Sequence, residues 1–335
     1  MKAWQVTAYG EPADALQLAD VPEPEPGEHL VVRVHAAALN FPDVLLCRGT
    51  YQERPPLPFT PGIELTGEVV GAPPDCAFRP GDRVLGGTSP GAGGAYGEYA
   101  VMKVADAYAV PEGMPVEQAA ALYLTYQTGH VGLHHRARLQ AGETLLVTAG
   151  AGGVGSAAIQ LGRAAGARVV ATAGGPDKVQ VCRDLGADYA IDYLADDFVA
   201  LVKEWTGGRG VDVVYDAVGG DVFDAARRVV AWEGRLVVVG FTSGRIPAAP
   251  ANHVLVKNYS VVGLHWGQYR TRNPEVVAAA HAELERLYGL GAIAPFVSQS
   301  FPFAELPAAL TALASRRTVG KVVLQVADPV AAPSS

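Results

Sequence analysis

The sequence predicts an α/β protein in which a doubly wound parallel sheet is accompanied by a second, mostly β domain. Three observations support this fold class. A glycine-rich run stands between a strand pattern and a helix pattern, strands and helices alternate from Thr125 to Leu264, and the first 122 residues show short strands between Pro- and Gly-rich turns. The chain has 335 residues, beyond the size at which a single core usually stops growing, so two domains are expected.

Residues 1–122 have the pattern of a β domain with few helices. Strand-like segments cover Leu30 to Ala37, Glu64 to Val70 and Arg83 to Gly86. The segment 21–27, which reads Val-Pro-Glu-Pro-Glu-Pro-Gly, is typical of the turns between such strands because Pro and Gly interrupt regular structure.

Residues 123–264 show six strand patterns that alternate with helix patterns. The strands are expected at 144–149, 168–172, 188–191, 211–216, 235–239 and 259–264. Strands joined by helical crossovers form a parallel sheet with helices on both faces. A helix pattern, 274–290, and a β-like tail, 296–326, follow, and we expect residues 265–335 to rejoin the first domain.

A glycine-rich turn is the most informative motif of the sequence. The run Gly150-Ala151-Gly152-Gly153-Val154-Gly155 lies after a strand pattern and opens a helix pattern, and a second strand pattern completes a βαβ unit. This context predicts a dinucleotide-binding turn, in which Gly150 allows the tight turn, Gly152 lets the backbone approach a pyrophosphate and Gly155 lets helix pack on strand. Unpaired N–H groups at the helix start would bind phosphate oxygens. A turn that binds nothing is the alternative.

The residues after the second strand of this unit indicate which dinucleotide binds. Folds specific for NAD place an Asp or Glu about twenty residues after the glycine turn, against the ribose 2′-OH. Here the strand ends in Ala171-Thr172-Ala173-Gly174-Gly175, and Asp177 and Lys178 are the first charged residues after it. A 2′-phosphate would have a cation within reach, so the sequence favours NADPH, with Ala173 and Lys178 as candidate cofactor residues. Lys178 as an ordinary solvated lysine is the alternative.

Composition and charge argue against several other classes of protein. The net charge is −8, which disfavours a general surface for nucleic acid or for anionic membranes. Cys47, Cys76 and Cys182 have no C-x-x-C spacing and indicate neither a disulfide framework nor a thiolate zinc cluster. The N-terminus has no pattern of a signal peptide, and no run of about 18 apolar residues occurs. We therefore expect a soluble, cytoplasmic protein without a membrane segment.

Five short motifs, together with the glycine turn, are similar to those of one family. They are Asn40-Phe41-Pro42-Asp43, Arg48-Gly49-Thr50-Tyr51, the segment 61–70 (PGIELTGEVV), Leu124-Thr125 and Gly320-Lys321-Val322-Val323. Over essentially its whole length the chain resembles the medium-chain dehydrogenase/reductase superfamily, and within it the zinc-free quinone oxidoreductases related to zeta-crystallin. The resemblance implies a Rossmann domain, a GroES-like catalytic domain and a substrate cleft between them.

The sequence departs from zinc-containing relatives at their ligand positions. Alcohol dehydrogenases have a Cys close to 40–43 and a His in place of Ile63, and their structural zinc lobe would fall in 86–102, which contains no Cys. An Ile cannot bind zinc, which needs three N, S or O donors and an open fourth position. His130 and His134 are spaced i, i+4 on a helix pattern but lack a third ligand. No metal site is therefore predicted.

The resemblance also implies which residues form the site. Asn40, Asp43 and Tyr51 would line the cleft near the nicotinamide, with Tyr51 as the best donor to a developing oxyanion. Alternatively, Tyr51 is only an aromatic wall, Asn40 only bridges backbone groups, or Asp43 only pairs with a cation such as Arg48. The implied cofactor residues are Thr125 at the ring, Tyr193, Lys178 and Arg316 at the 2′-phosphate, and Gly240, Phe241 and Thr242 on the nicotinamide side. Arg317 adjoins Arg316 and could take its role.

These expectations together describe an NADPH-dependent reductase that passes hydride to a quinone, or to another electron-poor carbonyl, without zinc. An activated C=C bond in an enone or enoyl thioester is an alternative acceptor. Leu45, where some relatives have a second Tyr, makes the pocket more apolar but does not separate the two. A NADPH-binding protein without turnover, either structural or RNA-binding, is a further alternative. Related proteins pair edge strands such as 259–264 across a two-fold axis, so a homodimer is expected.

Overall fold

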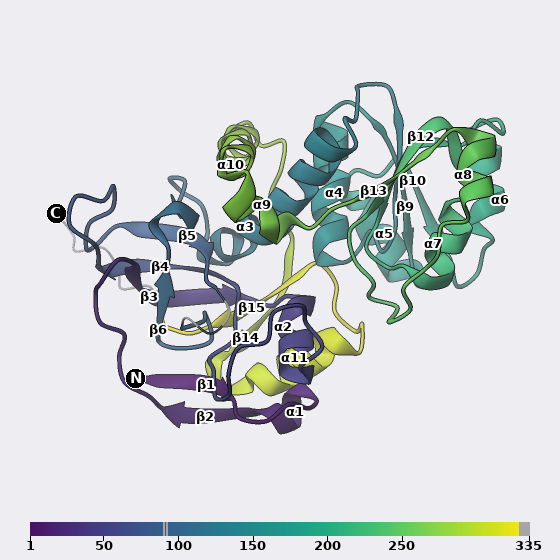
Figure 1. Ribbon diagram of the computed structural model, residues 1–335. Coiled ribbons are helices and arrows are strands. Elements are labelled where there is room, and N and C mark those ends of the chain that lie inside the picture. The colour runs from purple at the N-terminus through teal and green to yellow at the C-terminus, as the bar shows by residue number, and fades with distance from the viewer. Residues whose placement is uncertain (90, 92, 328–335) are drawn as a thin grey trace. The chain divides into compact units, whose positions relative to one another are not determined.

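The computed structural model describes residues 1–89, 91 and 93–327, and it divides into two compact units (Figure 1). The first unit comprises Met1–Leu124 and Pro295–Ser335, and the second comprises Thr125–Ala294. Each unit has its own sheet and its own apolar core.

The first unit is built on a seven-stranded sheet to which both ends of the chain contribute. The strand order is β14-β15-β3-β4-β5-β7, and β6 also pairs with β3. All pairs are antiparallel except β14 with β15. The strands are β3 (Leu30–Ala38), β4 (Glu64–Gly71), β5 (Arg83–Gly87), β6 (Tyr99–Met102), β7 (Ala107–Ala109), β14 (Val297–Pro302) and β15 (Lys321–Gln325), and a separate hairpin joins β1 (Lys2–Val6) to β2 (Leu16–Asp20).

The helices of the first unit are short and cover part of its core. They are α1 (Pro12–Ala15), α2 (Phe41–Arg48) and α11 (Leu306–Ala314), with 3-10 turns at Val104–Asp106 and Phe303–Glu305. The predicted β-like tail is wrong at α11. This segment has a Pro in its first turn and buries Leu306, Ala309 and Leu310 at helical spacing, which favours a helix over a strand.

Helix α2 positions two of the residues singled out from the sequence. Asn40 stands at its N-cap, where the backbone N–H of Asn40 donates to Asp43 Oδ2 at 2.9 Å. The helix ends at Gly49, whose φ of 64° lies in the left-handed region that favours glycine. Both ends of α2 are therefore fixed by local sequence.

The second unit contains a six-stranded parallel sheet in the order β10-β9-β8-β11-β12-β13. Its strands are β8 (Thr144–Val147), β9 (Arg168–Ala173), β10 (Tyr189–Asp192), β11 (Val211–Asp216), β12 (Val230–Val238) and β13 (Ser260–Gly263). This is the order of a doubly wound Rossmann sheet, so the predicted fold class is confirmed. The strand order reverses between β8 and β11, and ligands of such sheets bind outside the carboxyl ends of the strands at this point.

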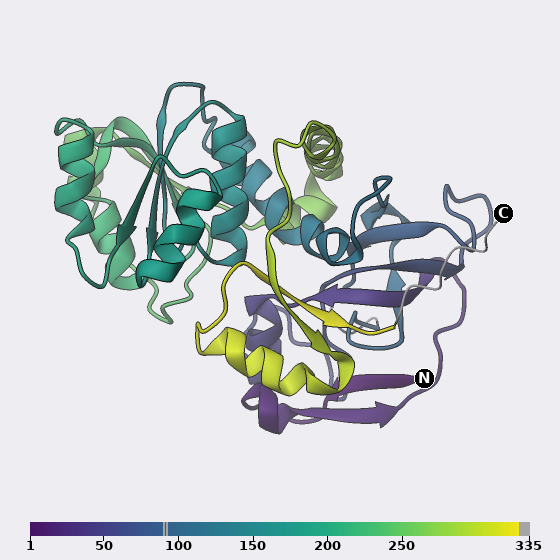
Figure 2. The ribbon, with the colours of Figure 1, turned by 180° about the vertical axis from the view of Figure 1, so that it is seen from behind.

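Helices lie on both faces of this sheet (Figure 1 and Figure 2). They are α4 (Gly153–Ala164), α5 (Pro176–Asp184), α6 (Phe198–Trp205), α7 (Gly220–Ala226) and α8 (Ala251–Lys257). The second unit also contains a π-helical turn (Val131–Arg136), α9 (Trp266–Arg272) and α10 (Pro274–Gly289). Helix α3 (Val116–His130) begins in the first unit and ends in the second. No helix in the described part of the chain is long and apolar enough to cross a membrane.

The region after the last strand of this sheet packs with the second unit. His281 on α10 lies with its Nδ1 3.1 Å from Nε2 of Gln127, and Gln160 Nε2 donates to the carbonyl of Ala294 at 2.9 Å. The compact units therefore divide at Ala294, whereas the sequence places the second boundary at 264/265.

Candidate active site and dinucleotide-binding turn

The glycine turn leaves β8 through a left-handed residue that is not a glycine. Ala149 has φ of 51°, whereas Gly150 has no positive φ. A Cβ on Gly150 would lie 2.9 Å from both Ala171 Cβ and Cys182 Sγ. The tight turn assigned to Gly150 from the sequence is thus made by Ala149, and Gly150 is needed because β9 and α5 approach its Cα.

The next glycines open α4. A Cβ on Gly155 would lie 2.2 Å from the carbonyl oxygen of Ala149, so only glycine fits where the helix meets the turn. Gly152 is the N-cap, and Gly152, Gly153 and Val154 are partly exposed, while Ala151 is buried. The first N–H groups of a helix have no intrahelical acceptor and carry the positive end of the helix dipole, so this turn can bind a phosphate.

The segments that follow β9 and β10 carry two of the candidate 2′-phosphate residues. Tyr193 is 44% exposed, and its hydroxyl lies 2.9 Å from the position that a Cβ on Gly174 would take. Lys178 lies in the first turn of α5 and is half-buried. Both side chains therefore belong to the segments that follow β9 and β10, next to Ala173.

A carboxylate that the sequence did not single out also lies there. Asp192 ends β10, and its Oδ1 accepts hydrogen bonds from Gly175 N at 2.8 Å and from Leu194 N at 3.0 Å. The sequence pattern finds no acidic residue at the end of β9, and Asp192 comes 17 residues after Gly175, on the neighbouring strand. Its charge is directed to the loop backbone, which it fixes.

The loops after β11 and β12 complete this edge of the sheet. Buried Asp216 accepts from Thr148 Oγ1 at 2.7 Å and from two backbone N–H groups of its loop, and burial raises its pKa. In the loop after β12, the backbone N–H of Thr242 donates to Ala217 O at 3.2 Å. Gly240 and Thr242 are partly exposed and Phe241 is 38% exposed, at the same edge as the glycine turn. This arrangement places the predicted nicotinamide-side residues at the switch-point edge.

In the first unit, Asn40 belongs to a buried ion-pair network. Lys321 Nζ donates to Asn40 Oδ1 at 2.6 Å and to Glu64 Oε2 at 2.9 Å, and Asn40 Nδ2 donates to Glu64 Oε2 at 3.1 Å and to Ala38 O at 3.1 Å. Lys321 is 3% exposed and Glu64 is 0% exposed. Glu64 Oε1 also accepts from Leu124 N at 2.8 Å. The network thus joins α2, β4, β15 and α3 at the residue before Thr125.

Asp43 lies beside this network and is fully buried. Its Oδ2 accepts from Tyr96 OH at 2.7 Å as well as from the N–H of Asn40. Burial raises the pKa of Asp43 to about 7 and raises the pKa of Tyr96 well above its usual value, because the charged form of each side chain would be buried without water around it. Tyr96 was not predicted, and its only sequence signal is a Tyr in a Gly-rich segment.

These contacts define what the three predicted catalytic residues can do. Asn40 is 5% exposed with its amide already hydrogen-bonded, and Asp43 is 0% exposed, so both are suited to positioning the backbone. Tyr51 follows α2, is partly exposed and packs against the apolar core. Of the three, Tyr51 alone has a hydroxyl on a partly exposed side chain.

The remaining predicted residues lie in different units. Thr125 is 3% exposed and begins the second unit. Arg316 and Arg317 follow α11 in the first unit, and Arg316 has φ of 58°. Their assignments to the nicotinamide and to the 2′-phosphate stay predictions.

The donor set does not fit a catalytic zinc. Ile63 is buried in the apolar core of the first unit, and burial raises the pKa of the Cys47 thiol to about 12, which opposes formation of a thiolate ligand. The rings of His130 and His134 lie 4.6 Å apart. Within residues 1–89, 91 and 93–327, no three His, Cys, Asp or Glu side chains are grouped as a metal site would require.

Comparisons with known proteins identify the family. The family described as zinc-binding dehydrogenase matches residues 153–282, and the one described as alcohol dehydrogenase GroES-like domain matches residues 25–112. The quinone oxidoreductase-like protein 2 homolog of Nematostella vectensis is 40% identical over 296 residues, which cover 88% of this chain and 80% of the relative. This chain belongs to the quinone oxidoreductase family of medium-chain dehydrogenases/reductases.

Further members of this family extend the similarity over the whole chain. The quinone oxidoreductase of Pseudomonas aeruginosa is 36% identical over 333 residues, which cover 96% of this chain and 99% of the relative. The crystal structure of Escherichia coli quinone oxidoreductase complexed with NADPH matches with a TM-score of 0.90 and 30% identity, covering 97% of this chain and 100% of the other. The predicted family is therefore confirmed.

Proposed function

We propose that this member of the quinone oxidoreductase family is an NADPH-dependent reductase that passes hydride to a quinone without a metal ion. The observation that carries the proposal is the crowded glycine turn, which opens α4 at the switch point of a Rossmann sheet. Relatives named as quinone oxidoreductases support the acceptor, and a similar structure that is complexed with NADPH supports the cofactor.

The residues of this chain fit a dinucleotide. No side chain can stand at Gly155, and a Cβ on Gly152 would approach only Ala149 O, at 3.3 Å, so the turn leaves its backbone open to a pyrophosphate. Lys178 and Tyr193 are proposed to bind the 2′-phosphate, with Arg316 as a further cation. Gly240, Phe241 and Thr242 are proposed to contact the nicotinamide side. NADPH supplies the hydride when it is bound.

In this proposal the acceptor is polarised by protein hydrogen bonds, and the described part of the chain groups no three His, Cys, Asp or Glu side chains as a metal site would require. We assign this role to the Tyr51 hydroxyl, which can donate to the oxygen that becomes negative. Asn40 and Asp43 would hold α2, the helix that leads to Tyr51, in place through their buried contacts. Their proposed contribution is therefore orientation rather than proton transfer.

A screen of NADPH oxidation tests the proposal. Purified protein is given NADPH with a benzoquinone, an enone or an enoyl thioester, with and without a chelator, and NADH replaces NADPH in a matched set. We expect turnover with the quinone, preference for NADPH and no effect of chelator. Turnover limited to the enone or thioester would replace the acceptor, activity lost with a chelator would refute the metal-free mechanism, and tight NADPH binding without any turnover would indicate a non-catalytic protein.

The proposed assembly is a homodimer that pairs β13 across a two-fold axis. β13 is the last strand of the sheet order, and Val261 on it is 39% exposed. Leu255 and Val256 on α8 are each 74% exposed. An unpaired apolar edge strand favours association with a second copy. Val261→Lys should shift the mass measured by analytical ultracentrifugation toward the monomer, and an unchanged dimer would place the interface elsewhere.

A further inference from the structure

The second unit has a hollow of about 400 Å³ that is lined by basic side chains. Gly208, Gly210 and Val229 complete its wall. Among the described residues, no carboxylate side chain lines it. The basic residues are Lys203 on α6, Arg209 in the turn before β11, Arg228 after α7, and His253 and Lys257 on α8.

The positive charges of this hollow are poorly compensated. In the described ranges, Lys203, Arg228 and Lys257 form no ion pair with a carboxylate, on a chain whose net charge is −8. Burial and the charge of Lys203 lower the pKa of Lys257. Cations that face one another in a partly buried hollow repel, and a bound anion would relieve that repulsion.

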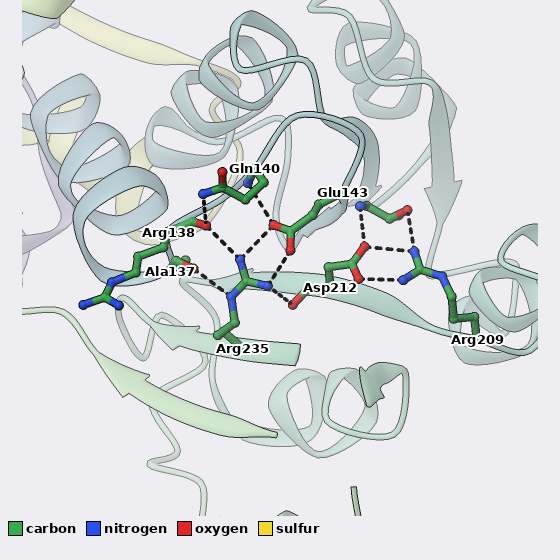
Figure 3. Close-up of polar contacts among 8 residues, drawn as sticks. Ala137, Arg138, Gln140, Glu143, Arg209, Asp212 and Arg235 are labelled. Carbon is green, nitrogen blue, oxygen red and sulfur yellow. Dashed lines mark hydrogen bonds and ion pairs between the residues drawn. The ribbon is translucent and has the colours of Figure 1, made fainter. Parts of the chain in front are cut away.

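Two of these cations are held in position by the protein. Lys257 Nζ donates to Arg228 O at 3.0 Å and to Val230 O at 2.9 Å, and since an ammonium has three N–H groups, one is left for a ligand. The guanidinium of Arg209 donates to both carboxylate oxygens of Asp212, at 2.6 and 2.9 Å (Figure 3). It also donates to Thr144 Oγ1 at 3.5 Å, and its five N–H donors exceed these three bonds. Preorganised donors of this kind reduce the entropy cost of binding.

The hollow is distinct from the dinucleotide-binding turn. Arg209 lies two residues before the start of β11, and Arg228 lies two residues before the start of β12, so the basic residues stand at the amino ends of parallel strands. The glycine turn follows the carboxyl end of β8 in the same sheet. The amino and carboxyl ends of parallel strands lie at opposite edges of a sheet. A dinucleotide bound at the glycine turn therefore does not occupy the basic hollow.

We propose that this hollow binds a small oligophosphate, an anion with two or three linked phosphate groups such as pyrophosphate, tripolyphosphate or the phosphate chain of a free nucleotide. A single phosphate monoester carries about −1.5 to −2 charges at pH 7, fewer than the three unpaired cations Lys203, Arg228 and Lys257. A chain of phosphates supplies enough charge and enough acceptor oxygens for donors that come from four segments. The concave shape favours a small anion over an extended strand.

Calorimetric titration with tripolyphosphate tests this site in the full-length protein. The titration is done in the presence of saturating NADPH, so that the dinucleotide turn is not the site that is measured. Lys203→Gln/Arg228→Gln removes two exposed charges and should weaken binding by roughly a hundredfold, about tenfold for each lost charge-assisted hydrogen bond. Arg163→Gln/Arg183→Gln removes two exposed charges from α4 and α5 and should change affinity less than twofold.

Each other outcome decides against the proposal. Equal losses in the two double variants would show a general charge effect, and tripolyphosphate binding that appears only when NADPH is left out would assign it to the glycine turn. Absence of wild-type binding at millimolar tripolyphosphate would refute the site, and tighter binding of a single-stranded oligonucleotide would identify a nucleic-acid surface instead. Lys257→Met provides a second variant, with the same expected direction, if the double variant is poorly folded.

Discussion

Lys321→Met is expected to destabilise the first unit strongly, because it breaks a buried ion pair. Lys321 Nζ lies 2.9 Å from Glu64 Oε2, and the two residues are 3% and 0% exposed. Without the ammonium, the donors left to the Glu64 carboxylate among the described residues are Asn40 Nδ2 and the backbone N–H of Leu124. Removing one partner of a buried pair typically costs about 3–5 kcal/mol, so we expect a loss of unfolding free energy in this range.

A double-mutant cycle separates this effect from loss of packing. Glu64→Met alone leaves the ammonium buried, whereas Lys321→Met/Glu64→Met removes both charges and should cost less than the sum of the single variants by about 2–3 kcal/mol. Lys103→Met, at an exposed lysine of the same unit, should change stability by about 0.5 kcal/mol or less.

The assay is urea unfolding followed by fluorescence, with hydrogen exchange of β4 and β15 to assign the transition to the first unit. This assignment is needed because a chain of two compact units does not have to unfold in one step. Additive single variants, or a loss below about 1 kcal/mol for Lys321→Met, would refute the idea that the pair acts as a buried unit.

Three further predictions concern the cofactor, the chemistry and the pH dependence. Lys178→Ala should weaken NADPH binding by roughly ten- to a hundredfold and spare NADH, as measured by fluorescence titration; equal weakening of both cofactors would contradict the assignment. Tyr51→Phe should lower quinone turnover by roughly tenfold or less, since quinones accept hydride readily, and Asn40→Ala should cost at least as much; a loss of about a thousandfold for Tyr51→Phe would instead indicate an obligate proton donor. Burial lowers the pKa of His281 to about 3, so unfolded His281 binds a proton below pH 6.5 that the folded ring does not, and stability falls as the pH drops. His281→Gln should therefore reduce the stability difference between pH 8 and pH 5 by about 2 kcal/mol in urea titrations, and an unchanged difference would show that other groups carry it.

Much of the fold could be predicted from the sequence because its signals are local. Strand β11 was expected at 211–216 and is found there, and the glycine turn marks the βαβ unit correctly. Helix α11 could not be separated from the strands around it, because a nine-residue apolar segment between β14 and β15 fits either pattern until its burial is known. The left-handed turn at Ala149 was missed for a related reason, since a positive φ at a non-glycine residue has no sequence signature.

The candidate site was less predictable, because its partners are far apart in the chain. Glu64 and Lys321 are separated by 257 positions, and each stands in a motif that was noted for its similarity to the family rather than for a role. Asp43 meets Tyr96 across 53 positions. Contacts of this separation depend on the sheet pairing of β3 with β4 and β15, which no local pattern specifies.

The polar residues next to α2 also show why a motif can indicate a site without indicating its chemistry. An Asn and an Asp three residues apart at a helix start are suited both to a substrate and to a helix cap, since the same oxygen and N–H groups serve either purpose. Burial decides between them: the Asn40 amide is occupied by Lys321, Glu64 and Ala38, and Asp43 accepts from Tyr96. A side chain that turned away from these partners would leave buried polar groups without hydrogen bonds, which is costly. The contacts therefore hold these side chains in one geometry. The network therefore fixes α2, the helix that precedes Tyr51, for which the role of donor is proposed.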